Sequence, residues 1–182
     1  MKPSILDTTL AAAKKDQPTV TPAGQPLRRL TEGVMFRDLP THVDERGSVV
    51  ELFDPRWEWH PDPLVFVYSF TIHPGYVKGW NLHQHHEDRY CLLQGKMELV
   101  LYDPRPASAT CGDICKIVLS EYNRRLVNVP RNVWHADHNI GNKDVLVVNF
   151  PTTAYDHANP DKLRLPIDSD LIPYKFSGAR GY

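Results

Sequence analysis

The sequence predicts an all-β fold in which short strands form a sandwich or a barrel. Helical periodicity is nearly absent, and many of the 16 prolines stand at segment ends, where they join strands rather than continue helices. From residue 34 onward, short apolar segments recur between turn residues, at 48–53, 64–72, 96–102, 114–119, 125–129 and 144–149. Strands of this length and spacing are typical of a closed or double-layered β architecture.

The chain is expected to form one domain preceded by an arm. Its 182 residues are enough for one well-buried core and few for two. Residues 1–30 contain few large apolar side chains, so we expect an irregular N-terminal arm with at most a short helix over residues 5–13. Residues 31–182 are expected to form the single domain, which ends in a C-terminal tail rich in proline, aspartate and aromatic residues.

The first polar motif lies between Gly75 and Gly95. Alternate residues of a strand point the same way, so Asn81 and His83 should share one face. The polar segment 84–87 is expected to be an exposed turn that brings Asp88 beside them on the next strand.

The second polar motif comes from a remote part of the chain. Val127 and Val129 lead to a turn at residues 130–132, which is followed by His135 and then Asn139. If both motifs line the same barrel, His135 joins the polar cluster of the first motif.

This spacing resembles the cupin superfamily. Its first motif combines a glycine, a His-x-His pair, an acidic residue and a second glycine, and its second combines proline, glycine, histidine and asparagine. Here Asn81 replaces the first histidine, Asp88 the glutamate and Asn132 the glycine. The resemblance implies a double-stranded β-helix, the cupin jelly-roll barrel, with residues 81, 83, 88 and 135 around one interior hollow.

A narrower resemblance, over roughly residues 34–176, is to the dTDP-4-dehydrorhamnose 3,5-epimerase family of nucleotide-sugar cupins. The family's early Asp-x-Arg-Gly-x-x-x-Glu pattern appears at residues 44–51. Further matches follow in the family's order: Asp103, Arg105, Ser108, Thr110, Gly112, Leu119, Ser120, Asn123, Tyr155 and the segment 167–171. The family works on nucleotide-activated sugars as a homodimer and generally without a metal, so the resemblance implies a sugar or nucleotide-sugar ligand, a homodimer and no required cofactor.

The departures from the family fall on its chemistry. Without a gap, Asn81 stands at the position of the catalytic histidine, Asp88 near that of the lysine, and Phe150 at that of the tyrosine. We therefore expect His83 to serve as the base, oriented by Asp168, and Tyr155 to serve as the acid. The residues expected to bind the substrate are Arg46, Glu51, Lys78, Asn81 and His135.

The favoured hypothesis is a nucleotide-sugar epimerase or isomerase that acts beside a carbonyl. Such a reaction needs a base with a pKa near neutrality, a group that stabilises the enolate oxygen, and an acid on the opposite face. Histidine suits the first role because its unperturbed pKa is about 6.5. Lys78 or a bound metal suits the second, and the fork of Arg46 suits a diphosphate.

Two alternatives remain open from the residues. The first is a metal-dependent cupin enzyme in which His83, Asp88 and His135, with Asn81 as a weak oxygen ligand, hold Zn, Mn, Fe or Ni. The second is a non-catalytic sugar-binding cupin, in which the same side chains only hydrogen-bond one another and a sugar.

Composition excludes several other classes. The formal net charge of −1 does not favour nucleic acid as a partner. No apolar run approaches the roughly 20 residues that span a bilayer, and the N-terminus lacks a signal pattern, so we expect no membrane association and a cytoplasmic location. The 3 cysteines are odd in number and form no Cys-x-x-Cys pair, which fits a reducing compartment.

Overall fold

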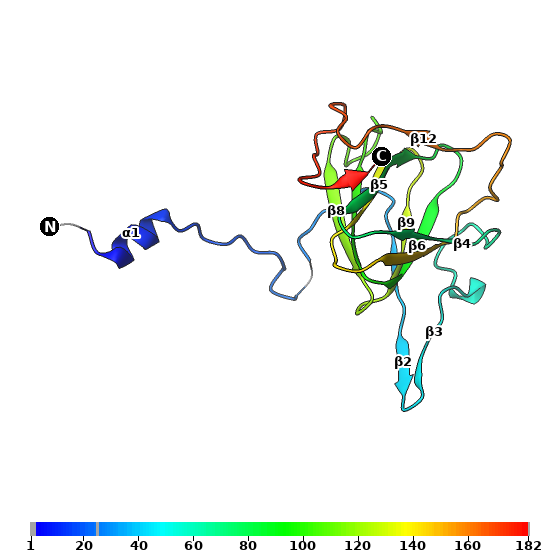
Figure 1. The fold of residues 1–182 in the computed structure, drawn as a ribbon, viewed down its shortest axis with the longest axis horizontal. Coiled ribbons are helices and arrows are strands. Elements are labelled where there is room, and N and C mark those ends of the chain that lie inside the picture. The colour runs from blue at the N-terminus through cyan, green and yellow to red at the C-terminus, as the bar shows by residue number, and fades with distance from the viewer. Residues whose placement is uncertain (1–2, 25, 182) are drawn as a thin grey trace.

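The computed structural model, which describes residues 3–24 and 26–181, is a jelly roll built from two facing β-sheets, as the sequence predicted (Figure 1). The first sheet has the order β1 (Phe36–Asp38), β9 (Arg125–Val129), β6 (Asp88–Gln94), β11 (Val145–Asn149), β4 (Tyr68–Ile72). The second has the order β12 (Leu163–Arg164), β5 (Tyr76–Leu82), β10 (Trp134–Asn139), β7 (Lys96–Tyr102), β8 (Ile114–Ser120), and β13 (Arg180–Gly181) pairs in parallel with β5. All other pairings are antiparallel.

Two elements project from the barrel. The N-terminal segment runs away from the barrel and carries α1 (Ile5–Ala12) (Figure 1). A capping box between Ser4 and Asp7 begins this helix, and none of the helix residues is buried. The hairpin of β2 (Thr41–Asp44) and β3 (Gly47–Val50) extends from another side, and the short 3-10 helix η1 (Pro55–Trp57) follows it. Among the residues described, no helix combines the length and the apolar character that a bilayer crossing requires.

The interior of the barrel changes from apolar to polar along its strands. On β6, the alternate side chains of Asp88, Tyr90 and Leu92 are all buried, and Leu92 joins the apolar core. On β11, Val145 and Val147 lie in that same core, and Asn149 follows them at the strand end. One end of the barrel is therefore filled with aliphatic side chains, and the other end holds the polar residues.

Both sheets are also covered on their outer faces. Trp80 is fully buried and packs against Tyr174 and Phe176 of the C-terminal tail, with ring centroids 6.3 and 5.5 Å apart. On the other sheet, Cys91 and Phe150 are buried against the segment that follows β3. Most residues of β5, β6 and β10 are buried, and a shift of one residue in register would move the polar side chains of the interior to the opposite face of their strand.

The residues from Asp103 to Gly112, which match the epimerase family's pattern, form a turn and not part of a functional site. The buried carboxylate of Asp103 accepts hydrogen bonds from the Arg105 guanidinium at 2.8 Å, from the Ser108 hydroxyl at 2.6 Å and from the Thr110 hydroxyl at 2.7 Å. These bonds fold the loop between β7 and β8 back on itself. Arg105 is thus half of a structural ion pair.

Gly79 sits where two strands approach too closely for a side chain. Its φ is +143°, and a Cβ atom there would lie 2.7 Å from Cα and Cβ of Ala136 and 2.8 Å from the His135 carbonyl oxygen. We expect Gly79→Ala to lower the free energy of unfolding by about 1–3 kcal/mol, because β5 and β10 must separate. Chemical denaturation measures this loss. Gly75→Ala is the control, since Gly75 has a φ of +74° and no atom within 4 Å of the added Cβ, and equal losses in both variants would contradict the clash.

Candidate functional site

Residues from both sequence motifs meet at the polar end of the barrel. Asp88 begins β6, His83 directly follows β5, and His135 comes from β10. Nε2 of His83 lies 3.2 Å from Oδ2 of Asp88, and Nε2 of His135 lies 3.5 Å from the same oxygen. The predicted convergence of these three side chains is therefore present in the structure.

Asp88 is the centre of this cluster. Its carboxylate also accepts hydrogen bonds from the Asn149 amide at 2.6 Å and from the Tyr90 hydroxyl at 3.0 Å. Burial opposes its charged form, but the hydrogen bonds from His83 and His86 and the positive charge of His83 hold the pKa of Asp88 well below its usual range. The cluster thus contains a permanent negative charge.

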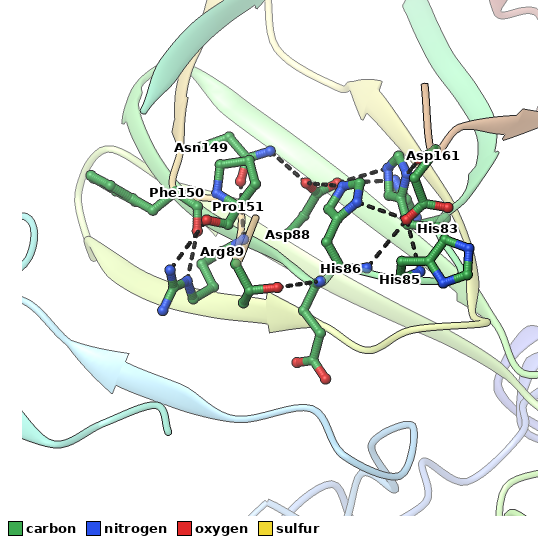
Figure 2. A network of polar contacts seen from close by, with 12 residues as sticks. His83, His85, His86, Asp88, Arg89, Asn149, Phe150, Pro151 and Asp161 are labelled. Carbon is green, nitrogen blue, oxygen red and sulfur yellow. Dashed lines mark hydrogen bonds and ion pairs between the residues drawn. The ribbon is translucent and has the colours of Figure 1, made fainter. Parts of the chain in front are cut away.

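A buried arginine fixes the strand that carries Asp88. The guanidinium of Arg89 donates to the backbone carbonyl of Phe150 at 2.6 Å (Figure 2). It also donates to the backbone carbonyls of Asp62 at 2.7 Å and Pro63 at 2.8 Å. These bonds tie the segment before β4 and the segment after β11 to β6. Arg89 faces away from the cluster, so it supports the position of Asp88 without contacting the cavity.

In both His83 and His135, one ring nitrogen faces a backbone carbonyl instead of Asp88. Nδ1 of His83 donates to the backbone carbonyl of Asp161, and Nδ1 of His135 faces the Val133 carbonyl at 3.4 Å. A carbonyl only accepts, so Nδ1 carries the proton in each ring and Nε2 is the atom that faces Asp88.

The two histidines differ in protonation. Burial opposes the charged form of His83, but the hydrogen bond to Asp88 and the charge of Asp88 outweigh it and raise the pKa of His83. Burial and the positive charge of His83 lower the pKa of His135 to about 3. His83 is therefore the imidazole that gains a proton readily, and His135 stays neutral.

His86 was expected in an exposed turn, and that prediction is wrong. Its ring packs against His83 at 4.1 Å between centroids, and its side chain is only 11% exposed. Nε2 of His86 lies 3.7 Å from Oδ1 of Asp88, and Nδ1 lies 2.8 Å from the Asp161 carboxylate. The turn folds inward because Asp161 gives its polar groups a partner.

Asp161 holds the turn between β5 and β6 in place. Its carboxylate accepts the backbone N–H groups of Gln84 at 2.9 Å, His85 at 2.8 Å and His86 at 3.2 Å (Figure 2). Together with its carbonyl, which accepts from His83, this residue orients two imidazoles. Asp161 is a positioning residue of the cluster that the sequence analysis missed.

Asp161→Ala should loosen this turn. Three backbone N–H groups and the His86 ring lose their acceptor, so we expect the free energy of unfolding to fall by about 1–3 kcal/mol. Chemical denaturation measures the change, with Asp170→Ala as control because the Asp170 side chain is fully exposed. Equal effects of both substitutions would show that Asp161 does not hold the turn.

The cluster forms one wall of an inner cavity of about 300 Å³. The cavity is lined by Tyr68, Ser69, Phe70, Lys78, Asn81, His83, Asp88, Tyr90, His135, Asp137 and Lys162. Burial and the charge of Asp88 raise the pKa of Asp137 to about 8, and burial lowers the pKa of Lys162. Lys78 and Asn81, which were expected to bind the substrate, line this cavity, whereas Tyr68, Asp137 and Lys162 were not singled out from the sequence.

A second, outer cavity of about 260 Å³ adjoins the first and shares Tyr68, His83 and Lys162 with it. Tyr155 lines this outer cavity and is 44% exposed. The hydroxyl of Tyr68 accepts a hydrogen bond from the Asn149 amide at 2.9 Å, so its own proton is free to be donated. Tyr68 thus lies where the two cavities join, and Tyr155 lies farther out.

Three predicted site residues lie elsewhere. The interactions of His83 are to Asp88 and Asp161, whereas the exposed Asp168 lines a separate groove with Lys175 and Arg180, so the predicted pairing of His83 with Asp168 is wrong. Arg46 lies at the tip of the β2–β3 hairpin and pairs with Asp44, and Glu51 is exposed just after β3. Neither Arg46 nor Glu51 lines the inner cavity of its own chain, because the hairpin projects from the barrel.

The donor atoms of the cluster fit a metal ion. His83, Asp88 and His135 form a set of three ligand atoms within 4.8 Å of one another, as do His83, His86 and Asp161. In the first set, both imidazoles present Nε2 and bind a carbonyl through Nδ1, which is the usual outer partner of a metal-ligating histidine. Asn81 lines the same cavity.

A jelly roll with a histidine–aspartate cluster in its interior defines a cupin. The comparisons then specify the family: the model described as the polysaccharide biosynthesis C-terminal domain matches residues 42–163. The chain belongs to this family. Its fold is also that of the dTDP-4-dehydrorhamnose 3,5-epimerase from Sulfolobus tokodaii, with a TM-score of 0.69 at 19% identity.

Individual relatives agree with this assignment. The chain is 36% identical over 137 residues to the probable low-salt glycan biosynthesis epimerase Agl13 of Haloferax volcanii, which covers 74% of this chain and 87% of the relative. It is 28% identical over 150 residues to the spore coat polysaccharide biosynthesis protein SpsL of Bacillus subtilis, covering 81% and 97%. A dTDP sugar isomerase from Desulfovibrio desulfuricans G20 superposes with a TM-score of 0.76 at 26% identity, covering 84% and 98%.

Proposed function

We propose that the protein is an epimerase that acts on a nucleotide-activated sugar at a carbon beside a carbonyl. The observation that carries this proposal is the buried His83–Asp88 pair, which lies 3.2 Å apart and opens on a polar cavity of about 300 Å³. The names of the relatives, a glycan biosynthesis epimerase and a dTDP sugar isomerase, support the same class.

In this proposal His83 removes the proton next to the carbonyl. The carbon–hydrogen bond breaks, its electrons form the enolate, and the proton goes to Nε2 of His83. The imidazolium that forms is stabilised by Asp88 at 3.2 Å and by the Asp161 carbonyl at Nδ1. Asp88 therefore takes the role that the sequence analysis gave to Asp168.

Lysine and tyrosine side chains complete the reaction. Lys78 and Lys162 line the inner cavity and are suited to stabilise the negative enolate oxygen. A proton returned to the carbon from the opposite face inverts its configuration, and the two candidates for this acid are Tyr68 and Tyr155. The free hydroxyl proton of Tyr68 and its place in both cavities favour Tyr68 over the predicted Tyr155.

The remaining elements of the hypothesis concern the nucleotide and the assembly. We propose a homodimer in which the β2–β3 hairpin of one copy contacts the barrel of the other. Val43 and Val49 on this hairpin are 76% and 66% exposed, so a second copy would cover apolar surface there. In that arrangement Arg46 could reach the substrate diphosphate of the other copy, and Glu51 could reach its nucleotide.

Solvent deuterium exchange tests the proposed reaction. The protein is incubated in D2O with 4-keto-6-deoxy sugar nucleotides, and proton NMR follows the carbons beside the ketone. We expect loss of the proton signal at one such carbon and appearance of the epimer. If these sugar nucleotides bind without exchange, the protein is a sugar-binding cupin instead.

A metal-dependent cupin enzyme is the second candidate, because Nε2 of His83, Nε2 of His135 and a carboxylate oxygen of Asp88 face one another. His83, Asp88 and His135 would hold the ion, and a bound Zn, Mn, Fe or Ni would polarise the substrate carbonyl as a Lewis acid.

Chelation distinguishes the two candidates. Since a proton on His83 can balance Asp88 without a metal, we expect exchange to persist, within about twofold, after treatment with a chelator and verification by elemental analysis. Stoichiometric metal that disappears in His135→Ala, together with activity lost on chelation and restored by the ion, would establish the metal enzyme instead.

A further inference from the structure

Asp137 is a buried acid that the proposed reaction does not use. It lies on β10, two residues after His135, and is 2% exposed. Side chains two apart on a strand point the same way, and Asp137 accordingly lines the inner cavity. Its Oδ1 atom is buried and has no hydrogen-bond partner among residues 3–24 and 26–181.

An unpaired buried oxygen of this kind is costly, since burial removes the water that it would otherwise bind. Two lysines are near, because Lys78 is the cross-strand neighbour of Asp137 on β5 and Lys162 lines the same cavity. Neither forms an ion pair with Asp137, and the Lys78 ammonium lies instead 5.9 Å from the centre of the Phe70 ring. The cavity therefore offers cationic donors and a separate, unused acceptor.

We propose that Asp137 determines substrate specificity by accepting a hydrogen bond from a hydroxyl or amide N–H of the sugar. The inference rests on the proposed function, because it places the sugar in the inner cavity. Oxygens of the sugar face Lys78 and Lys162, while a donor next to the reacting carbon faces Oδ1 of Asp137. The substrate is then a sugar that carries such a hydroxyl or amide N–H next to the reacting carbon, rather than a sugar that lacks it.

Binding measurements with matched sugars test this assignment. Calorimetry compares a 4-keto-6-deoxy sugar nucleotide that carries hydroxyls at carbons 2 and 3 with the analogues that lack one or the other. A deoxy analogue that leaves the buried Oδ1 of Asp137 unpaired should bind about 10-fold to 100-fold more weakly to the natural protein. In Asp137→Leu this difference should shrink below about twofold, because no acceptor remains.

Two variants keep the test decisive. Asp137→Asn retains a carbonyl oxygen and should keep part of the discrimination even if Asp137→Leu folds poorly. Asp113→Asn, at an exposed ion pair, should discriminate like the natural protein. Equal affinity for all three sugars in the natural protein, discrimination that survives in Asp137→Leu, or no binding of any of the sugars would overturn the proposal.

The outcomes separate this inference from the proposed function. Discrimination without deuterium exchange keeps the role of Asp137 in recognition and rejects the epimerase. Exchange with equal affinity for all analogues keeps the epimerase and rejects the role of Asp137.

Discussion

His83→Gln is expected to lower the rate of solvent deuterium exchange by about 10²-fold to 10⁴-fold, the usual contribution of a positioned general base. Glutamine preserves polarity and approximate size, but its amide cannot take a proton from carbon. His83 is the imidazole of the cluster whose pKa is raised, and the carboxylate of Asp88 lies 3.2 Å from its Nε2. The loss should appear in kcat, with sugar-nucleotide binding largely kept.

The pH dependence gives the same prediction a second readout. Only the neutral imidazole can accept a proton, so exchange should rise with pH, with a midpoint above the ordinary histidine pKa of about 6.5. Asp88→Asn removes the charge that raises the pKa of His83 and should move this midpoint down. His73→Gln is the control, since that side chain is 72% exposed. An unchanged exchange rate in His83→Gln would exclude His83 as the base.

Asp103→Ala is expected to lower the free energy of unfolding by about 3–5 kcal/mol, which is the usual cost of breaking a buried ion pair. The fully buried carboxylate bonds to Arg105, Ser108 and Thr110, and removing it leaves Arg105 and Ser108 their bonds to Glu32 but takes away the acceptor that all three share. Asp113→Ala, at an ion pair 49% exposed on the aspartate side, is the control and should cost about 0–1 kcal/mol. Similar losses in both variants would mean that the Asp103 network does not stabilise the loop.

The stabilisation that Asp103 gives to the folded protein should decrease as the pH falls. Burial opposes the charge of Asp103, but the hydrogen bonds from Arg105, Ser108 and Thr110 hold its pKa well below the usual range. A depressed pKa in the folded state stabilises the protein above the unfolded-state pKa of about 3.9, and this stabilisation is lost as pH falls toward the folded-state pKa. The difference between the natural protein and Asp103→Ala should thus be full at neutral pH and shrink in acid.

The sequence was sufficient for the barrel and for the centre of the cluster. Period-two alternation placed Asn81 and His83 together, and the second motif delivered His135 from a distant strand. Asp137 could have been found in the same way, since it follows His135 by two residues on the same strand. Strand periodicity is a local property, so it reports which face a residue occupies.

Loop conformations were not predictable in this way. His86 lies in a turn, and it points inward only because Asp161, 75 residues later, binds its backbone and its ring. Asp161 itself lies in an irregular segment without periodicity, and Asp168 in the same tail was chosen in its place. The position of Arg46 relative to the cavity depends on how far a hairpin extends from the barrel, which residue patterns do not encode.

The central claim is that a sugar occupies the inner cavity with its reacting carbon beside His83. A crystal structure of the slow His83→Gln variant with a 4-keto-6-deoxy sugar nucleotide tests it most directly. We predict the carbon next to the ketone at about 3–3.5 Å from the side chain of residue 83, with the ketone oxygen facing Lys78 or Lys162. A sugar held outside the barrel, with the histidine–aspartate cluster untouched, would contradict the account.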